Sequence, residues 1–81
     1  ANGRASFPNP TARFEREERE TVIQRALDGL PPDEKTVAVL RDIEGRSYEE
    51  IAMLTGMRPG TVKSRLARAR RRLRSKLEGI V

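Results

Sequence analysis

The sequence contains no cysteine and no histidine among its 81 residues. This absence excludes disulfide bonds, thiolate or imidazole metal sites, and catalysis by either side chain. Aromatic residues make up only 4% of the chain, so we expect aliphatic helix packing to stabilise one small core. No apolar run approaches the roughly 20 residues that span a bilayer, and no signal-peptide pattern is present. These absences predict a cytoplasmic protein that needs no cofactor and contacts no membrane.

Charge, in contrast, is abundant and unevenly distributed. Residues 1–40 hold six basic and seven acidic side chains, whereas residues 41–81 hold eleven basic and five acidic ones. The excess is concentrated between Arg58 and Lys76, where nine basic residues and no acidic residue occur. Cations at this density repel one another, and a phosphate backbone relieves the repulsion while releasing its counterions. We therefore predict a nucleic-acid partner, with a merely solvated basic helix as the alternative.

The apolar residues recur at helical spacing, which predicts an all-α fold of four helices without strands. The first helix is expected over residues 11–28 and the second from Pro32 to about residue 43. A Ser-x-x-Glu capping box at Ser47 predicts the start of the third helix, and Pro59 that of the fourth, which extends to about residue 77. The residues expected to face the core are Val22, Ile23, Ala26, Leu27, Leu30, Val37, Leu40, Ile43, Ile51, Ala52, Leu54, Val62, Leu66, Ala69 and Leu73.

The last two predicted helices have the proportions of a helix-turn-helix. A helix of about eight residues leads through a turn at Gly56 into a long helix with one apolar face and cations elsewhere. In this motif the second helix enters the major groove of DNA. We assign residues 11–81 to this domain. Residues 1–10, with two prolines and Ala1 in place of an initiator Met, are expected to be a flexible linker or a fragment end.

Four segments of the chain resemble one known family. They are Leu30-Pro31, LRDIEG at residues 40–45, SYEEIA at residues 47–52 and GTVKSRLARAR at residues 60–70. Together they are similar to the C-terminal, promoter-reading domain of bacterial sigma factors of the extracytoplasmic-function group, over residues 14–77. The resemblance implies recognition of the −35 promoter element as duplex DNA by a protein attached to RNA polymerase, with the other sigma domains preceding residue 1. One departure is Arg58, where a residue better at N-capping is expected.

The predicted DNA-contacting residues lie on the sides of the last helix away from its apolar face, and at the ends of the helices before it. The candidates for base edges are Thr61, Lys63, Ser64, Arg65 and Arg68. The candidates for phosphates are Arg41, Tyr48, Arg58 and Arg71. The remaining cations, Arg70, Arg72 and Arg74, are expected to add non-specific attraction or to pair with Glu17, Glu18 or Glu20.

The resemblance also implies protein partners. In sigma factors the first two helices grip the flap-tip helix of the polymerase β subunit, and an anti-sigma protein can compete for these surfaces. The candidates here are Val22, Ile23, Leu27, Val37 and Leu40.

Two other functions stay open. A response-regulator output domain also uses a Thr-Val-Lys helix, but its usual histidine is missing and it binds as a dimer. A protein-interaction module would use the basic helix on an acidic regulator or on RNA. An enzyme is not expected, because the sequence has no nucleophile–base constellation and no phosphate loop.

Overall fold

The structure is a computed structural model that describes residues 10–78, with side chains described from residue 15 onward. Its elements are α1 (Pro10–Asp28), α2 (Pro32–Ala38), the π-helical segment η2 (Val39–Ile43), α3 (Tyr48–Thr55) and α4 (Pro59–Glu78). η2 continues α2 without a break, because Ala38 and Val39 both keep right-handed helical backbone angles. Within the described range no strand occurs, so the predicted all-α fold of four helices is confirmed. Residues 1–9 of the predicted linker lie outside the described residues.

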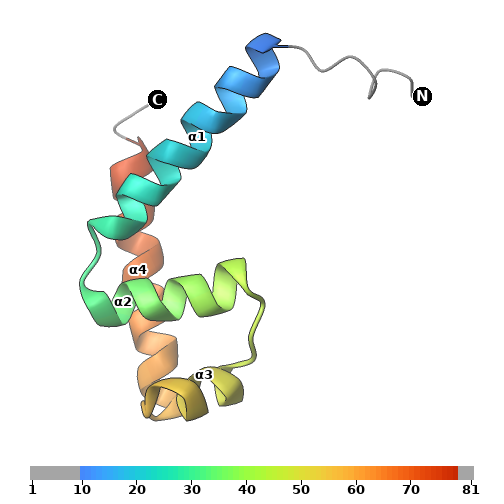
Figure 1. Cartoon of the computed structure of the whole chain (residues 1–81). Coiled ribbons are helices and arrows are strands. Elements are labelled where there is room, and N and C mark those ends of the chain that lie inside the picture. Colours follow the sequence, from blue (N-terminus) through green and yellow to red (C-terminus); the bar gives the residue numbers. More distant parts are fainter. Residues whose placement is uncertain (1–9, 79–81) are drawn as a thin grey trace.

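The helix α4 is the axis against which the other helices pack. Figure 1 shows α2 crossing α4 near its middle, with α3 beside the start of α4 and α1 beside its end. The predicted capping box orders the start of α3: Glu50 N donates to Ser47 Oγ at 3.1 Å, and Ser47 N donates to Glu50 Oε1 at 2.9 Å. The hydrogen bond from the Ser47 backbone N–H, followed by the contribution of the Ser47 side chain, lowers the pKa of the Glu50 carboxyl. Such a cap stabilises a helix by about 1 kcal/mol.

The turn between α3 and α4 depends on Gly56. Its φ of +77° lies in the left-handed region, which glycine adopts without strain, and its N–H donates to Ala52 O at 2.9 Å. The Thr55 hydroxyl accepts a hydrogen bond from Met57 N at 3.2 Å, which fixes the chain beyond the glycine. α4 then begins at Pro59, and the Arg58 carbonyl accepts the Val62 N–H at 3.0 Å. The helix therefore starts where predicted, although Arg58 offers no capping side chain.

The core consists of two apolar clusters, which lie on either side of the crossing of α2 and α4. The first cluster joins α1 to both helices, and the second joins α3 to both helices. Because α2 and α4 contribute to each cluster, these two helices hold the helix-turn-helix to α1. The first cluster contains Leu27, Leu30, Ala38 and Ala69, and the second contains Val37, Ile51, Val62 and Leu66.

Three predicted core residues are exposed instead, and Val22 is only half-buried. Ile43 is 63% exposed, because the wider π turn of η2 advances less per residue and carries it away from the face of Val37. Leu54 is 62% exposed, since the inward face of α3 runs from Ile51 to the half-buried Thr55. Ile23 is 46% exposed and belongs to neither apolar cluster. The predictions for these three side chains were wrong.

Candidate nucleic-acid interface

The side chains of α4 lie on a buried face, an outer face and two flanks. Val62, Leu66 and Ala69 are buried against the rest of the domain. The outer face, opposite the buried one, carries the exposed Ser64 and Arg71. The remaining side chains project to two flanks, one toward η2 and α3 and the other toward the start of α2. We name the first the Tyr48 flank, made of Arg41, Asp42, Tyr48, Lys63 and Arg70. We name the second the Glu34 flank, made of Glu34, Arg65, Arg68 and Arg72.

On the Tyr48 flank, two cations lie over the Tyr48 ring. The Arg41 Cζ atom is 4.7 Å from the ring centroid, and the Lys63 Nζ atom is 5.5 Å from it. Both distances fall within the range of attraction between a cation and an aromatic ring. Arg41 is fixed further, because its Nη1 donates to Arg46 O at 2.8 Å. The structure thus brings together three predicted DNA-contacting residues from three different elements.

The same flank holds an ion pair between α4 and η2. Arg70 donates from Nε to Asp42 Oδ2 at 3.1 Å and from Nη2 to Asp42 Oδ1, in a two-point contact. Hydrogen bonding to Asp42 is the main cause that raises the pKa of Arg70, with smaller electrostatic contributions from Asp42 and Tyr48. Arg70 therefore has an intramolecular partner in the free protein, and that partner lies on η2.

The Glu34 flank contains a buried carboxylate. Glu34 is only 4% exposed, and its Oε1 lies 2.9 Å from Arg72 Nε. This contact is an ion pair without hydrogen-bond alignment, and Oε1 receives no hydrogen bond from the described part of the chain. A buried carboxylate oxygen without a hydrogen bond is costly, because it has lost water and gained only charge attraction.

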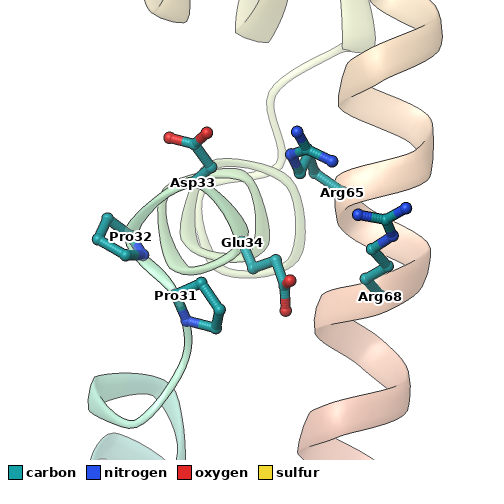
Figure 2. A pocket seen from close by; sticks show the side chains of 6 residues that line it. All are labelled: Pro31, Pro32, Asp33, Glu34, Arg65 and Arg68. Carbon is teal, nitrogen blue, oxygen red and sulfur yellow. The ribbon is translucent and has the colours of Figure 1, made fainter.

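Beside Glu34 lies an open hollow of about 300 Å³ between the start of α2 and α4. Figure 2 shows the Glu34 carboxylate turned toward α4, with the Arg65 and Arg68 side chains across the hollow and Asp33 pointing away. Neither Arg65 nor Arg68 has an ion pair among the residues described. A second hollow of about 250 Å³ is lined by Arg68, Arg71 and Arg72. Arg68 thus borders both hollows and keeps all its donors available for a ligand.

On the outer face, Ser64 has a defined hydrogen-bonding polarity. Its hydroxyl donates back to the helix, to Gly60 O at 3.2 Å and to Thr61 O at 3.3 Å. With its proton directed into the helix, the exposed oxygen is left to accept a hydrogen bond. Arg71 is exposed on the same face, and Arg58 is exposed just before the helix begins.

The predicted contact residues therefore lie on the outer face and on both flanks of α4, and they do not form one cluster. Lys63, Tyr48 and Arg41 form one group, Arg65 and Arg68 another, and Ser64 with Arg71 lies between them. Thr61 is half-buried and supplies a carbonyl to Ser64. Their roles in DNA binding remain predictions.

Sequence reasoning missed the carboxylates that face these cations. Neither Glu34 nor Asp42 was among the predicted site residues. However, Glu34 lies three residues before Val37, so the helical period places both on the buried face. An acidic residue on an inward face, in a chain with a run of arginines, is the signal that predicts an internal ion pair. Asp42 has no comparable signal, because the π turn determines which way it points.

Two further findings concern what the described residues do not contain. From residue 10 to residue 78, no group of three or more acidic, cysteine or histidine side chains is arranged to hold a metal ion. The same residues include no helix that is long and apolar enough to cross a bilayer.

Comparison with known proteins shows that the chain is similar to sigma factors. The model of the family described as sigma-70, region 4 matches residues 20–73, which is more than half of the chain. The ECF RNA polymerase sigma factor SigE of Mycolicibacterium smegmatis is 45% identical over 73 residues, or 90% of this chain. The ECF RNA polymerase sigma-E factors of Escherichia coli K12 and Salmonella typhimurium LT2 are each 36% identical over 73 residues. The aligned part is 28% of the Mycolicibacterium protein and 38% of each of the other two.

Proposed function

Because the chain belongs to the sigma-70 region 4 family, we propose that it recognises the −35 element of bacterial promoters as duplex DNA and thereby directs RNA polymerase to initiate transcription. The observation that carries this proposal is the first half of α4. There Lys63, Ser64 and Arg68 are exposed on a helix whose buried face is locked to α3. A helix held in this way can insert its N-terminal turns into the major groove. Such a protein acts in the bacterial cytoplasm, by recognition and without chemistry of its own.

The geometry suggests how the base contacts divide. Lys63 and Arg68 are donors, which match the O6 and N7 acceptors of guanine. Ser64 presents an acceptor, because its hydroxyl group donates to the carbonyl oxygens of Gly60 and Thr61. An exposed acceptor matches the amino group of adenine or cytosine. We therefore propose that Ser64 contacts a different kind of base from Lys63 and Arg68. Thr61 and Arg65 contribute at the margins.

Phosphate contacts come from the residues around this helix. Arg41 and Tyr48 lie on one side of α4, Arg71 on its outer face, and Arg58 at its start. Contacts of this kind fix the register of the protein on the duplex and give most of its affinity. The affinity should therefore fall steeply as salt is raised.

A second surface suits a protein partner, which we propose to be the flap-tip helix of the polymerase β subunit. The outer side of α2 bears a shallow hollow of about 430 Å³, lined by Pro32, Lys35, Thr36, Val39 and Leu40. Three of these five side chains are apolar. Of the residues first considered for this role, Leu27 and Val37 are buried in the core, so Leu40 and the exposed Ile23 are the better candidates. An anti-sigma protein would compete for the same surface.

The proposal is tested by selection from random DNA duplexes, with the 81-residue chain alone and in the presence of core RNA polymerase. We expect one non-palindromic element to be enriched, with stronger enrichment when polymerase is present. Two symmetric half-sites would instead indicate a dimeric output domain of the response-regulator type. Binding that ignores sequence would indicate an interaction module and contradict the proposal.

A further inference from the structure

The Tyr48 ring lies where three elements of the fold meet. It opens α3, contacts Arg41 from η2, and contacts Lys63 from the first turns of α4. Lys63 is exposed, and the described residues provide it with no ion pair. Among the described residues, it is therefore the Tyr48 ring that holds the Lys63 ammonium group.

The ring itself is held firmly. Tyr48 is half-buried and packs against the core cluster of Val37, Ile51, Val62 and Leu66. Its backbone is fixed as well, because the capping box between Ser47 and Glu50 encloses it. A ring that is fixed by the core on one side and by a capped backbone can restrict a flexible side chain that rests on it.

The restriction matters because lysine is a flexible side chain. A free lysine loses more rotamer entropy than most side chains when it becomes ordered. The attraction of a cation to an aromatic ring offsets part of that cost before any ligand is present. The gain is directional, since it favours the rotamers that place Nζ near the ring.

We propose that Tyr48 is a positioning residue that orients Lys63 for base reading, through its ring and independently of its hydroxyl group. The inference rests on the proposed function, in which Lys63 contacts a base edge. It goes beyond a phosphate contact by Tyr48, because a phosphate contact would require the hydroxyl and would not depend on Lys63.

The test compares Tyr48→Leu, which removes the ring, with Tyr48→Phe, which removes only the hydroxyl. Each variant of the 81-residue chain is titrated with the selected duplex and with duplexes that carry single base-pair changes. Lys63→Ala identifies the base pair that Lys63 reads, and Arg68→Ala identifies the one that Arg68 reads. The measured quantity is the ratio of affinities for the selected and the changed duplex.

We expect Tyr48→Leu to lower the ratio by about two- to fivefold at the base pair of Lys63, the range given by a cation–ring contact. The ratio at the base pair of Arg68 stays unchanged. Tyr48→Phe retains the ring and the ratio, because any affinity lost with the hydroxyl is shared by all duplexes and cancels. Combining Tyr48→Leu with Lys63→Ala should add no further loss of discrimination.

Several outcomes contradict the inference. Equal weakening on all duplexes by both tyrosine variants would assign Tyr48 to phosphate binding alone. If Arg68→Ala alters the affinity ratio at one base pair but Lys63→Ala alters it at none, Lys63 reads no base. That result would refute the inference and leave the proposed function standing. A wild-type chain without sequence preference would refute the proposed function itself.

A measurement on the unsubstituted chain covers the case in which Tyr48→Leu does not fold. The ring current of Tyr48 should shift the ε-methylene protons of Lys63 upfield relative to those of Lys35, whose recorded partner is Asp28 rather than an aromatic ring. Equal shifts for the two lysines in NMR spectra would overturn the inference.

Discussion

The two flanks of α4 hold their cations in different ways. On the Tyr48 flank, Arg41 and Lys63 lie over an aromatic ring and Arg70 is bound at two points by Asp42. On the Glu34 flank, Arg72 has only an unaligned ion pair, and Arg65 and Arg68 border an open hollow. The first flank therefore holds its cations through contacts within the protein, whereas the described residues leave Arg65 and Arg68 on the second flank without an ion pair. If α4 binds DNA as proposed, the cations of the first flank are positioned before the duplex arrives, and those of the second flank adapt to it.

The largest expected effect on DNA affinity comes from a substitution on the Glu34 flank. Arg68→Ala should cost about 1–3 kcal/mol at one base pair, because it removes an unpaired guanidinium that can bind guanine at two points. Arg71→Ala, on the outer face, serves as the control and should weaken binding to all sequences alike. Affinities for a panel of single base-pair variants distinguish the two patterns. Uniform weakening by Arg68→Ala would rule out base reading by this residue.

A smaller effect concerns the buried carboxylate. Glu34→Gln keeps the shape of the side chain but releases Arg72 and removes one negative charge near Arg68. If Arg72 gains one phosphate contact, the plot of log affinity against log salt becomes steeper by about 0.9, and affinity at 0.1 M salt rises by up to about tenfold. Titrations across a range of salt concentrations measure both quantities.

Asp33→Asn is the matched control for this prediction. It makes the same change of charge one residue away, at an exposed side chain that the described residues leave without an ion pair. Equal effects of the two substitutions would show that overall charge, and not the release of Arg72, controls affinity.

The smallest effect concerns the Tyr48 flank. The side chains of Arg70 and Asp42 are 49% and 39% exposed, so solvent weakens their attraction. A double-mutant cycle of Asp42→Ala and Arg70→Ala should therefore give a coupling energy of no more than about 1 kcal/mol in the free energy of unfolding. Urea denaturation of the four proteins measures it. A coupling near zero would mean that the ion pair does not order this flank, and the contrast between the flanks would rest on Tyr48 alone.

The helices were predictable because their signals are local. The capping box at Ser47, the glycine at position 56 and the proline at position 59 each act over a few residues, and each works as expected. The exposure of Ile43 was not predictable, because it depends on a π turn that no single residue of the sequence indicates. Leu54 was misplaced for a related reason, since a short helix contacts its neighbour through a very narrow face.

The candidate interface was predictable in composition but not in arrangement. The run of cations indicated which helix carries the candidate interface, and helical periodicity separated its apolar face from the rest. The partners of those cations come from residues far away in the chain: Asp42 lies 28 positions before Arg70. Such pairings depend on how α2 crosses α4, and that crossing is set by packing that spans the whole domain.

The crossing has one more consequence, which concerns how the domain unfolds. Val37 and Ala38 are neighbours in the sequence, yet Val37 belongs to the cluster with α3 and Ala38 to the cluster with α1. One turn of helix thus links both halves of the core, and neither half can open without exposing apolar surface of the other. The domain should behave as a single cooperative unit, in which α1, α3 and α4 are lost together. A partner that stabilises α1 would then also protect α4 against local opening, because both helices contribute to the first apolar cluster.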